Sequence, residues 1–332
     1  MKGHKPSILR FRALMKPVIW GGKRIASFKG IDCDNDHIGE SWELSPMPGN
    51  ESVAETWPYQ GETLSEIVAS DPEGILGSEV CARTGGKFPL LIKFIDSADD
   101  LSIQVHPDDR LAAARHNSLG KTEMWYSIDP APGAYLYAGF SRVLTPDEYR
   151  AAVKENTIVG ALRKFDVKRG DTFFLPAGRV HSIGRGNFVL EVQQASDVTY
   201  RIYDYDRRDK EGNPRQLHVE ESIDALNFGD TEMEVRNFSG DVPGLNTIAT
   251  SEYFTVSLLK TDGDEELPLK QGESFTIMVC VEGEAVLDAG EGQTYPVRRG
   301  ETLLVPAWTP SLTFRPMDES TKVVLIQRGE SS

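Results

Sequence analysis

Short apolar or alternating runs, separated by turn-forming residues, recur along most of the chain. Examples with Gly, Pro, Asp or Asn at their boundaries are FPLLIKFID, LSIQVH, DTFFLP, NFVLEVQQ and KVVLIQR. Runs of this length and composition are typical of β-strands. Helical patterns are few, and each opens with a proline or with carboxylates in its first turn. They occupy residues 61–70, 107–116, 146–162 and 218–228. The pattern therefore predicts a mainly β protein with a few short flanking helices.

A sequence repeat divides the chain into two β-rich parts. Residues 168–178 (KRGDTFFLPAG) and 298–308 (RRGETLLVPAW) share the same order of basic, glycine, acidic, threonine and apolar positions. Such self-similarity indicates a duplicated β unit. Residues 229–250 lose hydrophobic periodicity and are the best linker candidate. We therefore predict a first domain at residues 1–240 and a degenerate second domain at residues 241–332.

Composition narrows the classes of partner. The 332 residues are 39% hydrophobic and 26% charged, as expected for a globular chain, and 36 basic against 51 acidic residues give a net charge of −15. This charge disfavours nucleic acid and anionic lipid as partners. No apolar run reaches the length of a membrane helix, and the N-terminus has scattered charges where a signal peptide would be apolar. We expect a cytoplasmic protein, and its oligomeric state is not predicted.

Candidate metal ligands lie in three segments of the first part. In LSIQVH, strand alternation sends Gln104 and His106 to one face, and Lys121 and Glu123 are likewise two residues apart. A run rich in Gly and Pro then ends at His181. Gln104, His106, Glu123 and His181 make a set of N and O ligands with one negative charge, which would leave a bound Zn²⁺ Lewis-acidic.

Each of these residues also has an ordinary structural interpretation. His106 or His181 alone could be a surface histidine, and Lys121 with Glu123 could be an exposed ion pair of little energetic weight. Their occurrence together in one half of the chain favours the metal site. No histidine follows His218, so only the first part can hold such a site. Three cysteines without CxxC spacing suggest neither a disulfide framework nor a thiolate zinc site.

Charged residues on apolar strands predict a polar cavity. Glu191 and Gln193 share one face of the run NFVLEVQQ, and they line a cavity if that face points inward. Asp197 and Arg201 follow four residues apart, either beside that cavity or as an ion pair that supports a turn. Lys93 is a lone lysine in an apolar run, so it must reach an edge or face a wet cavity that holds an anion.

Several motifs resemble those of a known family. The run from Gly170 to His181 is similar to the second conserved motif of the cupin β-barrels. Together, six motifs resemble the short bacterial form of the type I mannose-6-phosphate isomerase family. These motifs are WGG at 20–22, GESWELS at 39–45, QVHPDD at 104–109, GKTEMW at 120–125, LPAGRVHSI at 175–183 and QQASDVTYRIYDYDR at 193–207. The resemblance covers residues 10 to about 230 and is weak over residues 240–330.

The resemblance implies a fold, a cofactor and roles for the candidate residues. The fold would be two cupin-type (jelly-roll) β-barrels. One Zn²⁺ per chain would be held by the four residues Gln104, His106, Glu123 and His181. The remaining candidates would serve the reaction and the sugar phosphate. Arg201 would be the active-site arginine, and Lys93, Lys121, Glu191 and Asp197 would line the sugar-phosphate pocket.

The implied activity interconverts mannose 6-phosphate and fructose 6-phosphate through an enediol. This reaction needs a base and positive charge beside the developing enediolate. We assign Arg201, Glu191 and Lys121 as catalytic and Lys93 and Asp197 as substrate-binding. Glu191 is the preferred base, with Lys121, Asp197 or a metal-bound water as alternatives. Two rival functions are a cupin dioxygenase, because two histidines and a glutamate also suit Fe(II), and a non-catalytic sugar-binding protein with two cupin domains. The basic residues favour a phosphorylated substrate.

Overall fold

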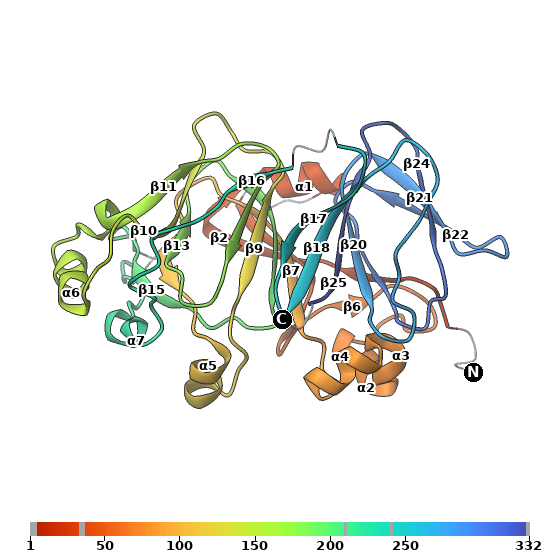
Figure 1. Cartoon of the computed structure of the whole chain (residues 1–332), viewed down its shortest axis with the longest axis horizontal. Helices are drawn as coiled ribbons and strands as arrows, with labels where there is room; N and C mark the ends of the chain where they lie inside the picture. Colours follow the sequence, from red (N-terminus) through yellow and green to blue (C-terminus); the bar gives the residue numbers. More distant parts are fainter. Residues whose placement is uncertain (1–4, 33–36, 209–210, 239–241, 330–332) are drawn as a thin grey trace.

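The computed structural model describes residues 5–32, 37–208, 211–238 and 242–329. These residues form five β-sheets surrounded by short helices (Figure 1). The prediction of a mainly β protein is confirmed. Within the described residues no sheet closes on itself, so the predicted pair of closed barrels is not confirmed. Each half of the molecule is instead a pair of facing sheets.

Two sheets make up the N-terminal half. The large N-terminal sheet has seven antiparallel strands. In spatial order they are β16 (Arg236–Asn237), β12 (Asp171–Leu175), β9 (Glu123–Ser127), β14 (Phe188–Gln194), β7 (Leu90–Asp96), β3 (Ile38–Leu44) and β2 (Leu14–Gly22). The small N-terminal sheet has five strands. They are β11 (Leu162–Asp166), β10 (Tyr135–Phe140), β13 (His181–Ile183), β8 (Ile103–Val105) and β15 (Tyr200–Tyr203).

Two further sheets make up the C-terminal half. The large C-terminal sheet contains β17 (Gly244–Thr250), β18 (Phe254–Lys260), β25 (Lys322–Arg328), β20 (Thr276–Glu282), β23 (Thr302–Val305), β1 (Leu9–Arg12) and β6 (Val53–Ala54). The small C-terminal sheet contains β19 (Glu265–Glu266), β24 (Thr313–Pro316), β21 (Glu284–Asp288) and β22 (Thr294–Arg298). A two-stranded hairpin is formed by β4 (Pro46–Met47) and β5 (Asn50–Glu51).

The helices are short and connect the strands. They are α1 (Arg24–Lys29), α2 (Leu64–Ser70), α3 (Pro72–Leu76), α4 (Ser78–Thr84), α5 (Asp109–His116), α6 (Pro146–Lys154), a 3₁₀ helix (Ile158–Ala161) and α7 (Val219–Ile223). Each segment expected to be helical contains at least one of them, and 146–162 contains both α6 and the 3₁₀ helix. The segment 146–162 is interrupted because Asn156 adopts a left-handed conformation, with φ of 56°. The sequence did not predict α1, α3 and α4, which are six, five and seven residues long.

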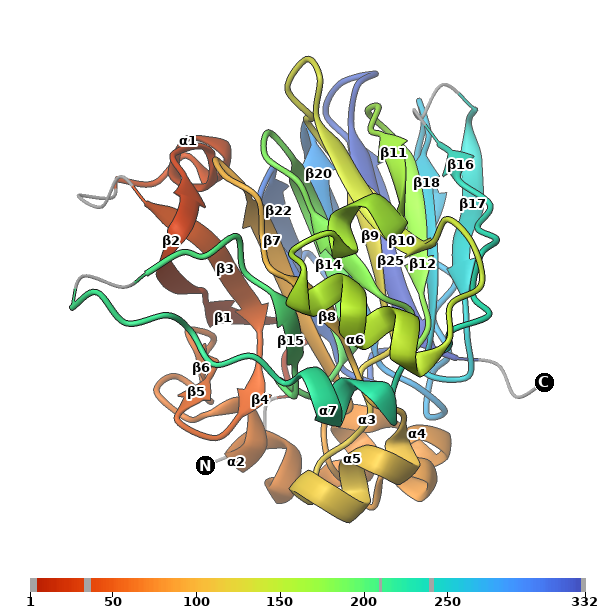
Figure 2. The same ribbon diagram turned by 90° about the vertical axis from the view of Figure 1, so that its left-hand side faces the viewer.

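The buried residues place the four main sheets in layers. Ile92, Phe94 and Leu190 from the large N-terminal sheet share one apolar cluster with Ile277 and Val324 from the large C-terminal sheet. The two large sheets therefore face each other at the centre of the molecule (Figures 1 and 2). Separate clusters fill the space between the large and small sheet of each half. The outer face of the small N-terminal sheet is covered by α5, α6 and α7.

Strand alternation explains which side chains reach the inside of the N-terminal half. On β7, Ile92 and Phe94 point to the central apolar layer, so Lys93 points to the opposite face, toward the small N-terminal sheet. On β14, Leu190 and Val192 likewise face the central layer and leave Glu191 on the inner face. The period of two thus brings charged side chains into the space between the two N-terminal sheets.

The predicted boundary at residue 240 stays a prediction, because residues 239–241 lie outside the described part of the chain. The N-terminal segment contributes to both halves. β1 pairs with β23 of the C-terminal half, with Leu9 opposite Leu304, while β2 is the edge strand of the large N-terminal sheet. The first strand therefore belongs structurally to the second half.

Among the described residues, no helix has the length and apolar character required to cross a membrane.

Candidate active site

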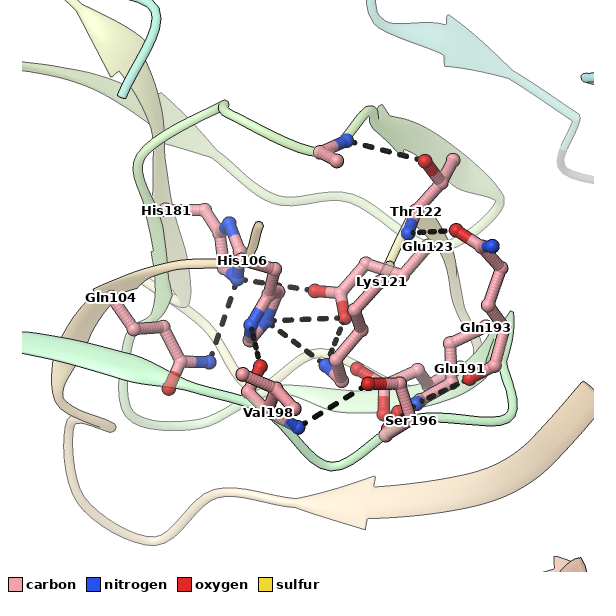
Figure 3. Close-up of polar contacts among 12 residues, drawn as sticks. Gln104, His106, Lys121, Thr122, Glu123, His181, Glu191, Gln193, Ser196 and Val198 are labelled. Carbon is pink, nitrogen blue, oxygen red and sulfur yellow. Dashed lines mark hydrogen bonds and ion pairs between the residues drawn. The ribbon is translucent and has the colours of Figure 1, made fainter. Parts of the chain in front are cut away.

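Three side chains predicted as metal ligands meet between the two N-terminal sheets. His106 follows β8, Glu123 begins β9 and His181 begins β13. Each is at most 1% exposed, and their ligand atoms all lie within 4.8 Å of one another (Figure 3). Glu123 Oε1 lies 3.1 Å from His181 Nε2, and Glu123 Oε2 lies 3.5 Å from His106 Nε2. This is the His and carboxylate cluster that the sequence suggested.

Backbone carbonyls set the orientation of both imidazoles. His106 Nδ1 lies 2.9 Å from the carbonyl oxygen of Val198, and His181 Nδ1 lies 2.9 Å from that of Arg179. A carbonyl only accepts, so Nδ1 carries the proton in each ring and Nε2 keeps its lone pair. Both lone pairs belong to atoms that face Glu123. Such hydrogen bonds to the distal nitrogen are typical of histidines that ligate metals.

Gln104 and Lys121 complete the polar cluster. The Gln104 amide lies 3.4 Å from His181 Nε2, opposite His181 in the register of β8 and β13. Lys121 Nζ donates to His106 Nε2 at 2.9 Å and also donates to Glu123 Oε2. The pair two residues apart in the sequence is therefore in contact, and it is buried rather than exposed. An ammonium is placed directly beside the three clustered side chains.

Electrostatics favour the protonation states that a metal requires. Burial, with the nearby charge of Lys121, holds the pKa of His106 well below its usual value, so its imidazole is neutral at pH 7. Burial alone would raise the pKa of Glu123. The charge of Lys121, which donates to Glu123 Oε2, outweighs burial and holds the pKa of Glu123 well below its usual value. Neutral imidazole and carboxylate are the forms that bind cations.

A cavity of about 230 Å³ adjoins this cluster. Aromatic and charged side chains from both N-terminal sheets line it. The sequence-predicted residues on its wall are Lys93, Gln104, Lys121, Glu191, Asp197 and Arg201. The sequence did not predict the other polar and aromatic lining residues. These include Trp20, Glu40, Trp42, Ser102, Trp125 and Arg215.

Lys93 and Glu191 form a buried ion pair on the cavity wall. They lie opposite each other in the register of β7 and β14, and Lys93 Nζ is 3.1 Å from Glu191 Oε2. Trp125 Nε1 donates to Glu191 Oε1 at 2.9 Å. Burial alone would lower the pKa of Lys93, but the charges of Glu191 and Glu40 outweigh it and hold that pKa above its usual value. A lysine within an apolar run was expected to reach an edge or to face an anion in a cavity. In the structure that anion is the carboxylate of Glu191.

Arg201 faces the same cavity from β15. Its Nε lies 3.4 Å from Ser102 Oγ, and Nη1 donates to the carbonyl of Gln216 at 3.2 Å. Burial, with the nearby charge of Arg215, lowers the pKa of Arg201. Among the described residues, no carboxylate lies within ion-pair distance of its guanidinium. Asp197 is exposed and forms no ion pair with Arg201 there, so the alternative of a pair that supports a turn is not observed.

Some of the unpredicted lining residues had a signal in the sequence. Trp42 and Glu40 are two apart in GESWELS, and Trp42 Nε1 donates to Glu40 Oε2 at 2.6 Å. The ring of Trp42 lies 5.0 Å from Lys93 Nζ. Strand alternation could have placed Glu40 and Trp42 on the same inner face of β3. Arg215 had no such signal, because it follows a polar segment without periodicity, where it donates to Asp204 Oδ2 at 2.7 Å.

Comparisons with known proteins agree with one another. Two family models match: the type I phosphomannose isomerase catalytic domain at residues 8–130 and the mannose-6-phosphate isomerase cupin domain at residues 245–316. A mannose-6-phosphate isomerase of Streptococcus mutans is 35% identical over 308 residues, which are 92% of this chain and 94% of that protein. One from Bacillus subtilis is 36% identical over 301 residues, 90% and 92% of the two chains. The crystal structure of the mannose 6-phosphate isomerase from Bacillus subtilis matches with a TM-score of 0.83 at 31% identity, over 97% of this chain and 99% of that one.

Proposed function

The chain belongs to the type I mannose-6-phosphate isomerase family, and on that premise we propose that it interconverts mannose 6-phosphate and fructose 6-phosphate. The family resemblance seen in its motifs is thereby confirmed. The observation that supports the activity most directly is the buried cluster of His106, Glu123 and His181. Its neighbours Gln104 and Lys121 line a cavity that also contains Lys93, Arg201 and Arg215. A sugar phosphate is the small-molecule partner that such a cavity suits.

A divalent cation fits this cluster. Glu123 Oε1 is buried without a hydrogen-bond donor, and it faces the Nε2 lone pair of His181. Two acceptors 3.1 Å apart are unfavourable unless a cation lies near both. We assign His106, Glu123, His181 and, through its amide oxygen, Gln104 as ligands of Zn²⁺. Bound there, Zn²⁺ would supply Lewis acidity toward an oxygen of the sugar.

The remaining residues have distinct roles in the proposed reaction. Glu191 is the proposed base that moves a proton between C1 and C2 of the sugar, because its carboxylate lies on the cavity wall. Trp125 and Lys93 fix the orientation of that carboxylate by contacting one oxygen each. Lys121 can donate a proton or a hydrogen bond to a sugar oxygen. Arg201, which has no carboxylate partner among the described residues, stabilises the enediolate charge.

Positive charge on the cavity wall supports a phosphorylated substrate. Lys93, Lys121, Arg201 and Arg215 all line the cavity. A phosphate group forms strong charge-assisted hydrogen bonds with such residues. Lys93 and Asp197 keep their proposed substrate-binding roles. A dioxygenase that used Fe(II) at the same ligands would have no need of four basic side chains, so the isomerase is favoured over this rival.

Metal replacement tests the proposed function. The purified chain is stripped with a chelator, and Zn²⁺ or Fe²⁺ is returned separately. Conversion of mannose 6-phosphate to fructose 6-phosphate is then followed, together with oxygen consumption. We expect isomerisation to disappear on stripping and to return with Zn²⁺. Oxygen uptake with Fe²⁺ and no isomerisation would support the dioxygenase. Absence of turnover with either metal would support a sugar-binding protein.

A further inference from the structure

The C-terminal half contacts the active site through a chain of hydrogen bonds. Tyr253 lies in the turn between β17 and β18, and its hydroxyl donates to Asp109 Oδ2 at 2.7 Å. Asp109 Oδ1 accepts from Gln194 Nε2 at 3.0 Å. Gln194 Oε1 in turn accepts from the backbone nitrogen of Thr122 at 2.8 Å. Thr122 lies between Lys121 and Glu123, two of the proposed working residues.

Thr122, at the end of this series of hydrogen bonds, has three polar contacts. Gln194 accepts from the Thr122 nitrogen with its side chain and donates its own backbone nitrogen to the Thr122 carbonyl at 3.1 Å. The hydroxyl of Thr122 accepts from the backbone nitrogen of Ala177 at 3.2 Å (Figure 3). The nitrogen, the carbonyl and the hydroxyl of Thr122 therefore each have a hydrogen-bond partner. Gln194 supplies two of the three contacts.

Asp109 decides that orientation. Its Oδ1 accepts from the backbone nitrogen of Gly120 at 2.7 Å as well as from Gln194. A Cβ on Gly120 would lie 2.6 Å from the Asp109 nitrogen, so only glycine allows this approach. The neighbouring Asp108 caps α5 by accepting from the Leu111 nitrogen, which leaves Asp109 available for the contact with Tyr253.

Of the four residues linked by these hydrogen bonds, Tyr253 alone comes from the C-terminal half. Burial and the carboxylate of Asp109 raise the pKa of Tyr253, so its hydroxyl remains a donor at neutral pH. With that hydrogen bond in place, both Asp109 oxygens have fixed partners. Without it, the carboxylate can rotate and release Gln194.

We propose that Tyr253 is a positioning residue, through which the C-terminal half holds Lys121 and Glu123 in their working geometry by way of Asp109 and Gln194. This inference rests on the proposed function, because it concerns the residues assigned to the metal and the sugar. It gives the C-terminal half a part in the active site in addition to its packing.

The test uses Tyr253→Phe in the full-length, zinc-loaded chain, because this change removes only the hydroxyl. We expect kcat to fall on the order of tenfold, while KM for mannose 6-phosphate stays within about twofold. We also expect the zinc dissociation constant, measured by competition with a chelator, to rise on the order of tenfold. The matched control is Tyr295→Phe, whose hydroxyl contacts Gln293 in the same half at 3.3 Å and should change neither value.

Variants of Asp109 provide a second test that does not depend on the folding of the tyrosine variant. Asp109→Asn keeps an oxygen for Gly120 and Gln194 and can donate to the Tyr253 hydroxyl, so it should retain most activity. Asp109→Leu should lose at least as much kcat and zinc affinity as Tyr253→Phe. Adding Tyr253→Phe to Asp109→Leu should cost nothing more.

Three results would overturn the proposal. One is a folded Tyr253→Phe enzyme with wild-type kcat and zinc affinity. Another is equal loss in Asp109→Asn and Asp109→Leu. The third is additive loss in the double variant. Inactivity of the unmodified, zinc-loaded chain would instead contradict the proposed function, so the two failures are distinguishable.

Discussion

His106 and His181 illustrate how single atoms define the proposed metal site. Each ring uses Nδ1 to donate to a backbone carbonyl, and this leaves Nε2 as the atom that faces Glu123. The sequence could predict that these residues meet, because their strand positions and the Gly- and Pro-rich run limit where they can lie. It could not predict the carbonyl partners, since Val198 and Arg179 act through backbone atoms that have no residue-specific signature.

Removal of one imidazole tests the ligand assignment. In His181→Ala one of four proposed ligands is absent, and we expect zinc affinity to fall by at least about 100-fold while the fold persists. The measurement is a competition titration of the stripped protein, with circular dichroism to verify folding. The matched control is His116→Ala, an exposed histidine that contacts the Tyr200 hydroxyl at 2.8 Å. Full zinc stoichiometry in His181→Ala would show the assignment to be wrong.

Arg201 allows electrostatic catalysis to be separated from substrate binding. A guanidinium beside the reacting carbons stabilises the enediolate more than the neutral sugar, so Arg201→Ala should lower kcat far more than it raises KM. We expect a loss on the order of 100–1,000-fold in kcat, with partial recovery in Arg201→Lys. Steady-state kinetics provide the measurement, with the exposed Arg208→Ala as control. Near-normal kcat with a raised KM would make Arg201 a phosphate ligand instead.

At the scale of elements, the WGG motif ends β2 and lies against Asp96 at the end of β7, in the same large N-terminal sheet. A Cβ on Gly22 would lie 2.0 Å from Asp96 Oδ2. That carboxylate accepts from the backbone nitrogen and from Nε of Arg24, each at 2.7 Å. Arg24 also donates to the carbonyls of Asp129 and Asn187. Glycine is therefore required at position 22 of the motif, because β2, β7 and α1 meet there and leave no space for a side chain.

Gly22→Ala should consequently destabilise the fold. The added methyl group must displace the buried Asp96 carboxylate from Arg24, and we expect the free energy of unfolding to fall by about 2 kcal/mol. Chemical denaturation provides the measurement. Gly160→Ala is the matched control, because nothing lies within 4 Å of its added Cβ and the residue is exposed. Equal stability of the two variants would contradict the explanation.

Strand alternation predicts on which face of a strand a side chain lies, but the pairing of strands decides which side chains are in contact. Alternation correctly put Glu191 on the face opposite to Leu190 and Val192, and it required a polar environment for Lys93. It could not show that Glu191 and Lys93 are each other's partner, because the pairing of β7 with β14 joins segments almost a hundred residues apart. The contact of Tyr253 with Asp109 spans 144 residues and was unpredictable for the same reason.

At the scale of the whole molecule, the two halves share their largest apolar layer. Phe94 and Leu190 from the N-terminal half lie in the same buried cluster as Val256, Ile277 and Val324 from the C-terminal half. β1 is hydrogen-bonded within the C-terminal sheet although it precedes the entire N-terminal half in sequence. Arg169 and Glu282 add an ion pair between the halves at 2.8 Å. A division of the chain at the predicted boundary, residue 240, would therefore separate strands that share this buried layer.

This shared layer predicts cooperative unfolding. Separation of the halves would expose the central cluster and remove β1 from its partner β23, so neither half should remain folded when the other unfolds. Calorimetry of the full-length, metal-free chain should show one transition, with equal calorimetric and van't Hoff enthalpies. Leu9 lies in β1, the strand that crosses between the halves, and it is fully buried opposite Leu304. Leu9→Ala should therefore lower the free energy of unfolding by about 2–5 kcal/mol and move the single transition to a lower temperature. Two separate transitions, of which Leu9→Ala shifts only one, would show that the halves are independent domains and that the layer between them contributes little.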